Sequence, residues 1–105
     1  MRVELLFADG DPAAMPARQN LVEVLTEDAF ETPIQMIVVA SEADATMLGM
    51  RGSPMIRIDG RDIDPDWAGP IGIASRAYGG DSFPAKPLIR HAVERARGWA
   101  HGRRP

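Results

Sequence analysis

Residues 52–65 read GSPMIRIDGRDIDP, and this stretch carries the clearest local signals in the chain. Apolar and polar residues alternate from Met55 to Asp59, which is the period of a half-exposed β-strand. Asp59 is followed by Gly60, a dipeptide that favours a two-residue hairpin turn. The residues after the turn (RDI) are therefore expected to return antiparallel to the first strand.

The N-terminal part of the chain predicts a strand, a helix and a second strand. Residues 2–7 (RVELLF) are short and apolar, as in a buried strand. Asp11 before Pro12 favours a helix start, because Asp is a preferred N-cap and Pro suits the first helical position. Apolar residues recur behind it at spacings of three and four, which predicts a helix that ends near residues 28–30. The run IQMIVV at 34–39 predicts a strand covered on both faces.

The C-terminal part predicts two further helices and a long connection between them. Ser41 with Asp44 three residues later is an approximate capping box for a short helix that ends near Gly49. Glycines and prolines recur throughout residues 64–82, which we expect to form one extended loop. The last helix is expected to begin between residues 84 and 87.

The resulting order is βαβαββα, with a mixed central sheet flanked by helices. This is the thioredoxin-like order, so the expected fold class is thioredoxin-like α/β. A chain of 105 residues fits one domain, which we assign to residues 1–100. Residues 101–105 (HGRRP) are expected to form a frayed C-terminal tail.

Composition excludes several classes of function. The net charge of −3 gives no reason to expect nucleic acid or an anionic membrane as a partner. No apolar stretch approaches the roughly 18 residues of a membrane span, and the N-terminus lacks the pattern of a signal peptide. We therefore expect a cytoplasmic protein.

The 105 residues contain no cysteine. Disulfides, thiolate nucleophiles and thiolate metal sites all require that sulfur, so the chain itself cannot provide them. His91 and His101 are ten positions apart, outside the spacing of a helical metal pair. We expect no metal site and no cofactor.

The segment at 52–62 resembles a motif of small bacterial thioredoxin-like proteins, some of them labelled alkylmercury-lyase-like. That motif reads G-S-P-T/S-I/V-x-I/V-D/N-G-x-D. Met55 departs from it at the small-residue position. The matching residues are Gly52, Ser53, Pro54, Ile56, Ile58, Asp59, Gly60 and Asp62.

Two weaker segments extend this resemblance and show where the family cysteines are missing. The family's F-x-G-C-P segment corresponds to FADGDP here, with Asp11 at the cysteine position and Pro12 at the proline. A later G-L/I-x-C-R-x-Y segment corresponds to residues 72–78, with Ser75 at the cysteine position. The resemblance implies a cis Ser53–Pro54 peptide facing the start of the first helix. It also implies that thiol-disulfide exchange and organomercurial cleavage are lost, because aspartate and serine cannot replace the thiols.

Asp11 and the Ser53–Pro54 dipeptide each have a functional and a structural interpretation. Asp11 is either a general acid or base at a helix N-terminus or, as we favour, a helix cap. The Ser53–Pro54 backbone either pairs with an extended ligand or only fixes the entry of a strand, and these alternatives stay open.

The residues of the long loop also have two interpretations. The aromatic residues Trp67, Tyr78 and Phe83 either pin the loop to the body or form a contact surface. Four arginines near the loop are candidates for binding an anion: Arg51, Arg57, Arg61 and Arg76. For Arg57 and Arg61 the simpler interpretation is pairing with Asp59, Asp62 or Asp64 at the surface.

The leading hypothesis is a redox-inactive thioredoxin-like module that binds a protein, a peptide or a small molecule near the cis-proline groove, with a homodimer as a further option. No catalytic residue is assigned. The expected ligand-binding residues are Asp11, Pro12, Ser53, Pro54, Trp67, Ser75, Arg76 and Tyr78. One alternative is a non-thiol enzyme that uses Asp11 as acid or base and Ser75 or Arg76 to position a substrate. Another is a structural subunit with an apolar patch that contains Trp67 or Trp99.

Overall fold

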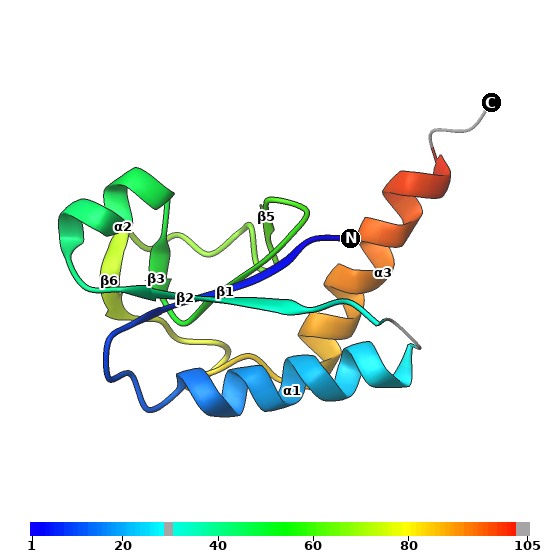
Figure 1. Cartoon of the computed structure of the whole chain (residues 1–105), viewed down its shortest axis with the longest axis horizontal. Helices are drawn as coiled ribbons and strands as arrows, with labels where there is room; N and C mark the ends of the chain where they lie inside the picture. The colour runs from blue at the N-terminus through cyan, green and yellow to red at the C-terminus, as the bar shows by residue number, and fades with distance from the viewer. Residues whose placement is uncertain (29–30, 103–105) are drawn as a thin grey trace.

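The computed structural model describes residues 1–28 and 31–102, which form a mixed α/β structure (Figure 1). A mixed four-stranded sheet lies between helices, and a short two-stranded sheet adjoins it. The elements in chain order are β1 (Val3–Ala8), α1 (Ala14–Glu27), β2 (Ile34–Val39), α2 (Glu42–Leu48), β3 (Arg51–Ser53), β4 (Met55–Ile58), β5 (Arg61–Asp62), β6 (Gly72–Ser75) and α3 (Lys86–Gly102).

The main sheet has the strand order β2-β1-β4-β5. β1 and β2 are parallel, with Val3 opposite Ile34 at one end and Ala8 opposite Val39 at the other. β4 is antiparallel to both of its neighbours, β1 and β5. The second sheet pairs β3 with β6 in parallel. Connecting two parallel strands through α1 is the crossover that the strand-helix-strand pattern predicts.

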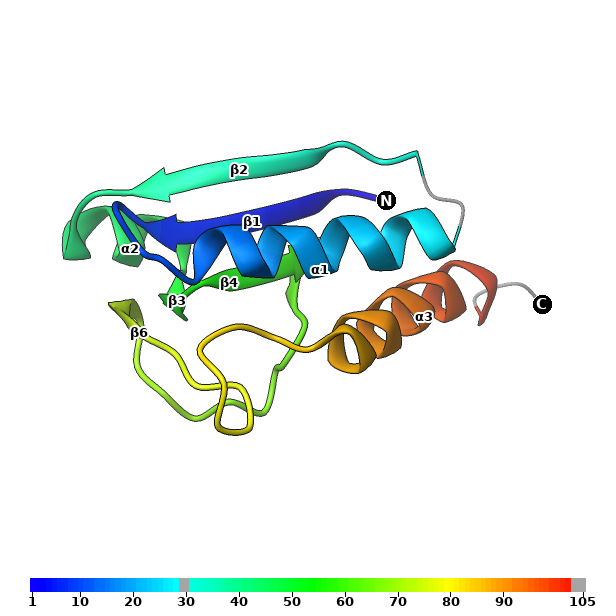
Figure 2. The same ribbon diagram turned by 90° about the horizontal axis from the view of Figure 1, so that it is seen from below.

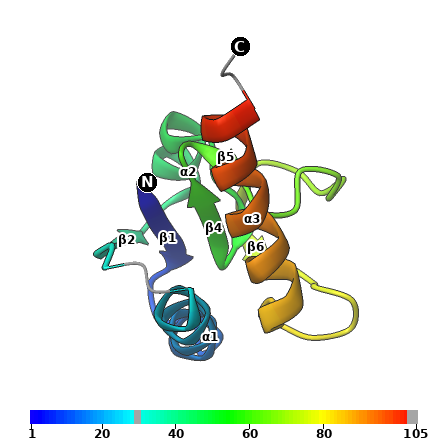
Figure 3. The same cartoon turned by 90° about the vertical axis from the view of Figure 1, so that its right-hand side faces the viewer.

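The two faces of the main sheet are covered by different helices. Successive side chains of a strand point to opposite faces, so Leu5 and Leu6 enter different clusters. Leu5 packs with Leu21 of α1 and Ile89 of α3, and these two helices lie side by side (Figures 2 and 3). Leu6 packs on the other face with Ala45 of α2. In the described part of the chain, no helix is long and apolar enough to span a bilayer.

Several local predictions are confirmed by the backbone. Asp59 and Gly60 both have positive φ, at 52° and 82°, which is the geometry of the hairpin turn that Asp-Gly favours. β4 and β5 pair antiparallel across this turn. At α2 the Ser41 hydroxyl accepts a hydrogen bond from the Asp44 amide at 3.1 Å, and Gly49 ends the helix with φ of 68°.

The predicted start of the first helix is wrong by two residues. α1 begins at Ala14, its N-cap is Ala13, and no side chain caps it. Asp11 instead accepts a hydrogen bond from the Ala13 amide at 2.9 Å, so it closes a separate turn that contains Pro12. The helix ends at Glu27, and the residue 30 named as its latest end lies outside the described residues.

The predicted loop at 64–82 contains a strand that sequence patterns did not indicate. β6 exists because it pairs with β3, and both are too short and irregular to show a strand period. α3 begins at Lys86, inside the predicted interval. The predicted tail is wrong in part, because α3 continues to Gly102, whereas residues 103–105 lie outside the described residues.

Candidate functional site at the cis-proline turn

The Ser53–Pro54 peptide bond is cis and lies between β3 and β4. The Ser53 side chain faces the turn that follows β1. Its hydroxyl accepts a hydrogen bond from the Ala8 amide at 2.8 Å and donates one to Oδ2 of Asp11 at 2.5 Å. Ser53 is only 2% exposed, so both hydrogen bonds lie away from bulk solvent.

The two carboxylate oxygens of Asp11 have different partners. Oδ1 accepts from the Ala13 amide of its own turn, and Oδ2 accepts from the Ser53 hydroxyl. Asp11 therefore links the segment before α1 to the cis-proline turn. Asp11 is half-exposed and Pro12 is exposed, so this segment forms part of the surface above Ser53.

The backbone of the cis-proline turn is covered by the chain's own β6 segment. The Ser53 carbonyl accepts a hydrogen bond from the Arg76 amide at 3.0 Å, and the Pro54 carbonyl accepts one from the Tyr78 hydroxyl at 2.5 Å. Of the two alternatives for Ser53–Pro54, strand entry is the one that this geometry favours. An extended ligand would have to displace Arg76 and Tyr78, which follow β6, to reach these carbonyls.

Arg76 is a charged residue near the turn whose side chain is buried and hydrogen-bonded through both terminal nitrogens. It is 1% exposed, and its two terminal nitrogens donate to the two carboxylate oxygens of Asp62, both at 2.8 Å. The same nitrogens donate to the carbonyls of Arg51 and Asp64. An ion pair of this kind is bidentate and strongly oriented. The expectation that Arg76 contacts a ligand needs correction, because its guanidinium is buried and supports the loop instead.

Aromatic rings lie against the Arg76 guanidinium, whose carbon is 4.5 Å from the centre of the Trp67 ring and 4.9 Å from the centre of the Tyr78 ring. Tyr78 is buried, and burial raises the pKa of its phenol above the ordinary value. Trp67 is half-buried, so these aromatic residues pin the loop to the body, as the structural interpretation predicts. Gly52 makes this packing possible, because a Cβ there would lie 2.9 Å from Trp67 Cη2 and the φ of Gly52 is +79°.

An open hollow of about 270 Å³ lies beside this assembly. Ser75 is exposed on its rim, at the position where the resembling family carries a cysteine. The residues that line it are Ser75, Arg76, Ala77, Gly80, Asp81 and Ser82. Ser53 and Pro54 are hydrogen-bonded to the segment that forms this hollow, and Asp11 is hydrogen-bonded to Ser53. Trp67 contacts the same segment through the Arg76 guanidinium.

The arrangement favours recognition over covalent chemistry. Asp11, the acid or base of the enzyme alternative, has both carboxylate oxygens hydrogen-bonded, one to the Ala13 amide and the other to the Ser53 hydroxyl. The Arg76 guanidinium is buried and holds in place the segment that lines the hollow. Trp67 forms no exposed patch of the kind that a structural subunit needs, and the side chain of Trp99 lies outside the description.

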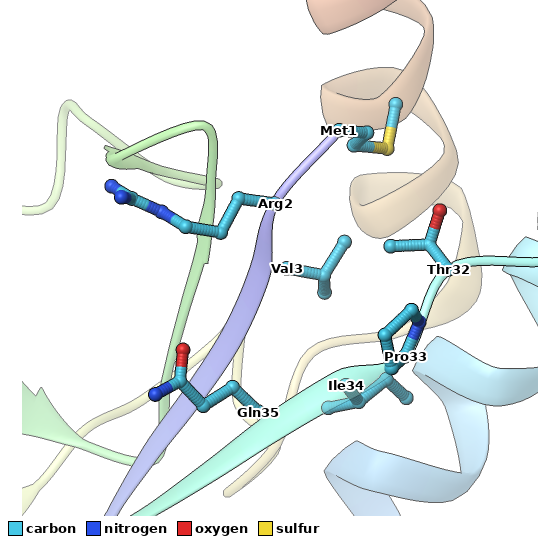
Figure 4. Close-up of a pocket in the computed structure, with 7 residues that line it drawn as sticks. All are labelled: Met1, Arg2, Val3, Thr32, Pro33, Ile34 and Gln35. Atoms are coloured by element: carbon cyan, nitrogen blue, oxygen red, sulfur yellow. The ribbon is translucent and has the colours of Figure 1, made fainter.

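Two further pockets lie away from the turn. Figure 4 shows one of about 240 Å³ at the other end of β1, lined by Met1, Arg2, Val3, Thr32, Pro33, Ile34 and Gln35. The other has about 340 Å³ and is lined by Arg51, Arg61, Asp62, Pro65 and Arg95. The sequence singled out Arg51 and Arg61 but missed Arg95, since only the packing of α3 brings it to this place. Among the described residues, no group of three or more His, Cys, Asp or Glu side chains is placed to hold a metal ion.

Comparison of the chain with protein-family models, with curated proteins and with solved structures gave no match. The function is therefore inferred from the contacts around the cis-proline turn and from the surface beside it.

Proposed function

We propose that the chain is a thioredoxin-like binding module without thiol chemistry, which recognises a protein, a peptide or a small molecule beside the cis-proline turn. The strand order β2-β1-β4-β5 supports the thioredoxin-like assignment, together with a cis-proline that enters β4 and faces the segment before α1. The resemblance of residues 52–62 to small bacterial proteins of that fold agrees with it. The proposal keeps the cytoplasmic location expected from the sequence.

The observation that carries the proposal is the hydrogen bond between Ser53 and Asp11. In the resembling family the position of Asp11 holds a thiol, whereas here a carboxylate fastens the same segment to the cis-proline turn. Because the Asp11 carboxylate is hydrogen-bonded within both turns, it maintains the shape of the site and does not serve as a nucleophile. The module therefore binds through shape, exposed polar groups and backbone contacts.

The ligand surface lies next to the turn rather than on its covered carbonyls. Pro12 and Ser75 are exposed and Asp11 is half-exposed, and the hollow at residues 75–82 extends this surface. Arg76 and Tyr78 form its buried support. An open, shallow surface of this kind suits a protein loop, a peptide or a small molecule better than a large ligand that needs an enclosed cavity.

Self-association is a separate proposal, which uses the β2 edge instead of the surface beside the cis-proline turn and has a second copy of this chain as the partner. β2 stands at one end of the strand order and contains no charged residue, so two copies can pair antiparallel without placing like charges opposite each other. Val38 is 55% exposed on this strand, and such pairing would cover it. A two-fold arrangement of this type is closed and self-complementary.

The test is an amide NMR screen of the full chain against a library of small fragments and random-sequence peptides. We expect the amide chemical-shift changes to concentrate at residues 9–11 and 74–82. Ser75→Arg fills the hollow and should abolish them, whereas Ala43→Arg on α2 is the matched control and should leave them intact. Shift changes that fall elsewhere, or that persist in Ser75→Arg, would contradict the proposed surface.

A further inference from the structure

Three arginines from distant parts of the chain line one pocket of about 340 Å³. Arg51 comes from β3, Arg61 from β5 and Arg95 from α3. We call this site the arginine pocket, and Asp62 and Pro65 complete its lining. Guanidinium groups have planar donor geometry that matches carboxylate and phosphate oxygens.

The charge of the arginine pocket is positive even though Asp62 lines it. Both oxygens of Asp62 already receive hydrogen bonds from Arg76, which lies behind the pocket and is itself buried. Arg76 therefore offsets the negative charge of Asp62, and the three lining arginines make the pocket positive. Asp64 is half-exposed and Asp66 is exposed on the adjoining loop, where solvent screens them more than it screens Asp62. A positive pocket is a local departure from a chain whose net charge is −3.

Two of the lining arginines keep donor capacity that their protein contacts do not use. Arg51 donates to the Trp67 carbonyl, while its contact with Asp62 is long, at 3.4 Å. Arg95 donates to the Ile63 carbonyl at 3.3 Å through one of its two terminal nitrogens. Because a guanidinium offers five N–H donors, each of these side chains can still bind oxygen atoms.

The same contacts hold the guanidinium groups in place before any ligand arrives. Arg51 is fastened to the Trp67 carbonyl and lies 5.7 Å from the centre of the Trp67 ring, and Arg95 is fastened to the Ile63 carbonyl. Donors that are already oriented lose less conformational entropy on binding.

We propose that the arginine pocket binds a small anion with two or more carboxylate or phosphate groups. A single charged group would engage only part of three converging guanidiniums, whereas two or more groups separated by a short carbon or oxygen bridge engage them together. The pocket uses neither Asp11, Pro12 nor Ser75, so this site goes beyond the proposed function and is tested independently of it.

The test is thermal unfolding of the full chain in citrate, in pyrophosphate, in acetate and in sodium chloride at matched ionic strength. We expect citrate, pyrophosphate or both to raise Tm by about 5 °C at concentrations roughly tenfold above Kd. Acetate should do no more than the salt control. A response to citrate alone identifies carboxylate groups as the ligand chemistry, and a response to pyrophosphate alone identifies phosphate groups.

Substitutions place the response in the arginine pocket. Arg95→Gln and Arg61→Gln should each weaken binding of the responding anion about tenfold or more, as expected when a charged hydrogen bond is lost. Arg97→Gln is the matched control, because Arg97 lies on the same helix but does not line the pocket. Arg61 is exposed, so its variant keeps the test decisive should Arg95→Gln fail to fold. The proposal is overturned if both polyvalent anions act only as the salt control does, or if the Arg61 variant responds like wild type.

Discussion

The Asp11 carboxylate and the Ser53 hydroxyl lie 2.5 Å apart although 42 positions separate them in the chain. Through this hydrogen bond the turn that leads into α1 is fastened to the cis-proline turn that leads into β4. The carboxylate also closes its own turn through the Ala13 amide. One side chain thus combines a local and a long-range structural role.

This double role predicts how Asp11 variants change stability. Asp11→Ala removes both hydrogen bonds and should lower the free energy of unfolding by about 1–2 kcal/mol. Asp11→Asn keeps an oxygen for the Ala13 amide and should cost less. Urea unfolding measures both changes, and Asp9→Ala, at an exposed neighbouring position, is the control that should stay near wild type.

The hydrogen bond between Asp11 and Ser53 is measured by a double-mutant cycle of Asp11→Ala and Ser53→Ala. Because the two side chains are in contact, their effects should not add, and we expect a coupling of about 1 kcal/mol. Strict additivity would show that the hydrogen bond contributes nothing to the folded state.

Arg76→Met should be among the most destabilising changes in the chain. It leaves Asp62, whose side chain is 6% exposed, without its bidentate partner, and removing one member of a buried pair costs about 3–5 kcal/mol. Arg90→Met is the comparison, because the Arg90–Glu27 pair is partly exposed and contributes about 0–1 kcal/mol. Equal losses of unfolding free energy in the two variants would contradict the structural role of Arg76.

Gly52→Ala should also be strongly destabilising. Its Cβ would lie 2.9 Å from both Trp67 Cη2 and Arg76 Cβ, in addition to the penalty of a φ of +79°. Gly79→Ala separates the two effects, since Gly79 has a φ of +62° with no atom near its Cβ position. That control should lose only about 1–2 kcal/mol, and Gly52→Ala should lose clearly more in the same unfolding measurement.

The Tyr78 phenol predicts a loss of stability at alkaline pH. Burial raises its pKa in the folded state, so the unfolded chain releases the phenolic proton first, near pH 10. This contribution to stability is fully present below pH of about 10 and declines as the pH rises further.

Tyr78 is the one tyrosine of the chain, which makes its ionisation visible in the tyrosinate absorbance. We expect this absorbance to appear together with unfolding and not before it. Tyr78→Phe should reduce the alkaline dependence of the unfolding free energy. Ionisation near pH 10 in the folded protein would show that the phenol is accessible to solvent.

Self-association through β2 predicts that the average molecular mass of the protein in solution rises with protein concentration. Val38→Lys introduces a charge on this strand and should shift the equilibrium toward monomer. Met47→Lys on α2 is the control, because Met47 is 85% exposed but does not belong to the strand that would pair. Sedimentation equilibrium measures all three proteins, and a wild type that stays monomeric throughout would exclude this form of binding.

The sequence by itself determined the elements whose geometry depends on near neighbours. Asp59 and Gly60 adopt the positive φ values of a tight hairpin because they tolerate that backbone better than other residues do. Ser41 and Gly49 bound α2 because a hydroxyl and a flexible backbone satisfy the helix ends within a few residues. The absence of cysteine likewise decided, without any structure, which chemistry the chain cannot perform.

Only the tertiary structure decided what the residues around the cis-proline turn do. Asp11 has a typical capping sequence, yet it closes an earlier turn and its second oxygen binds Ser53 across the fold. The sequence predicts that Arg76 binds a ligand, but its side chain is buried against Asp62 and two aromatic rings. Such roles depend on residues that are distant in the chain and near in space, and local sequence patterns carry no record of that proximity.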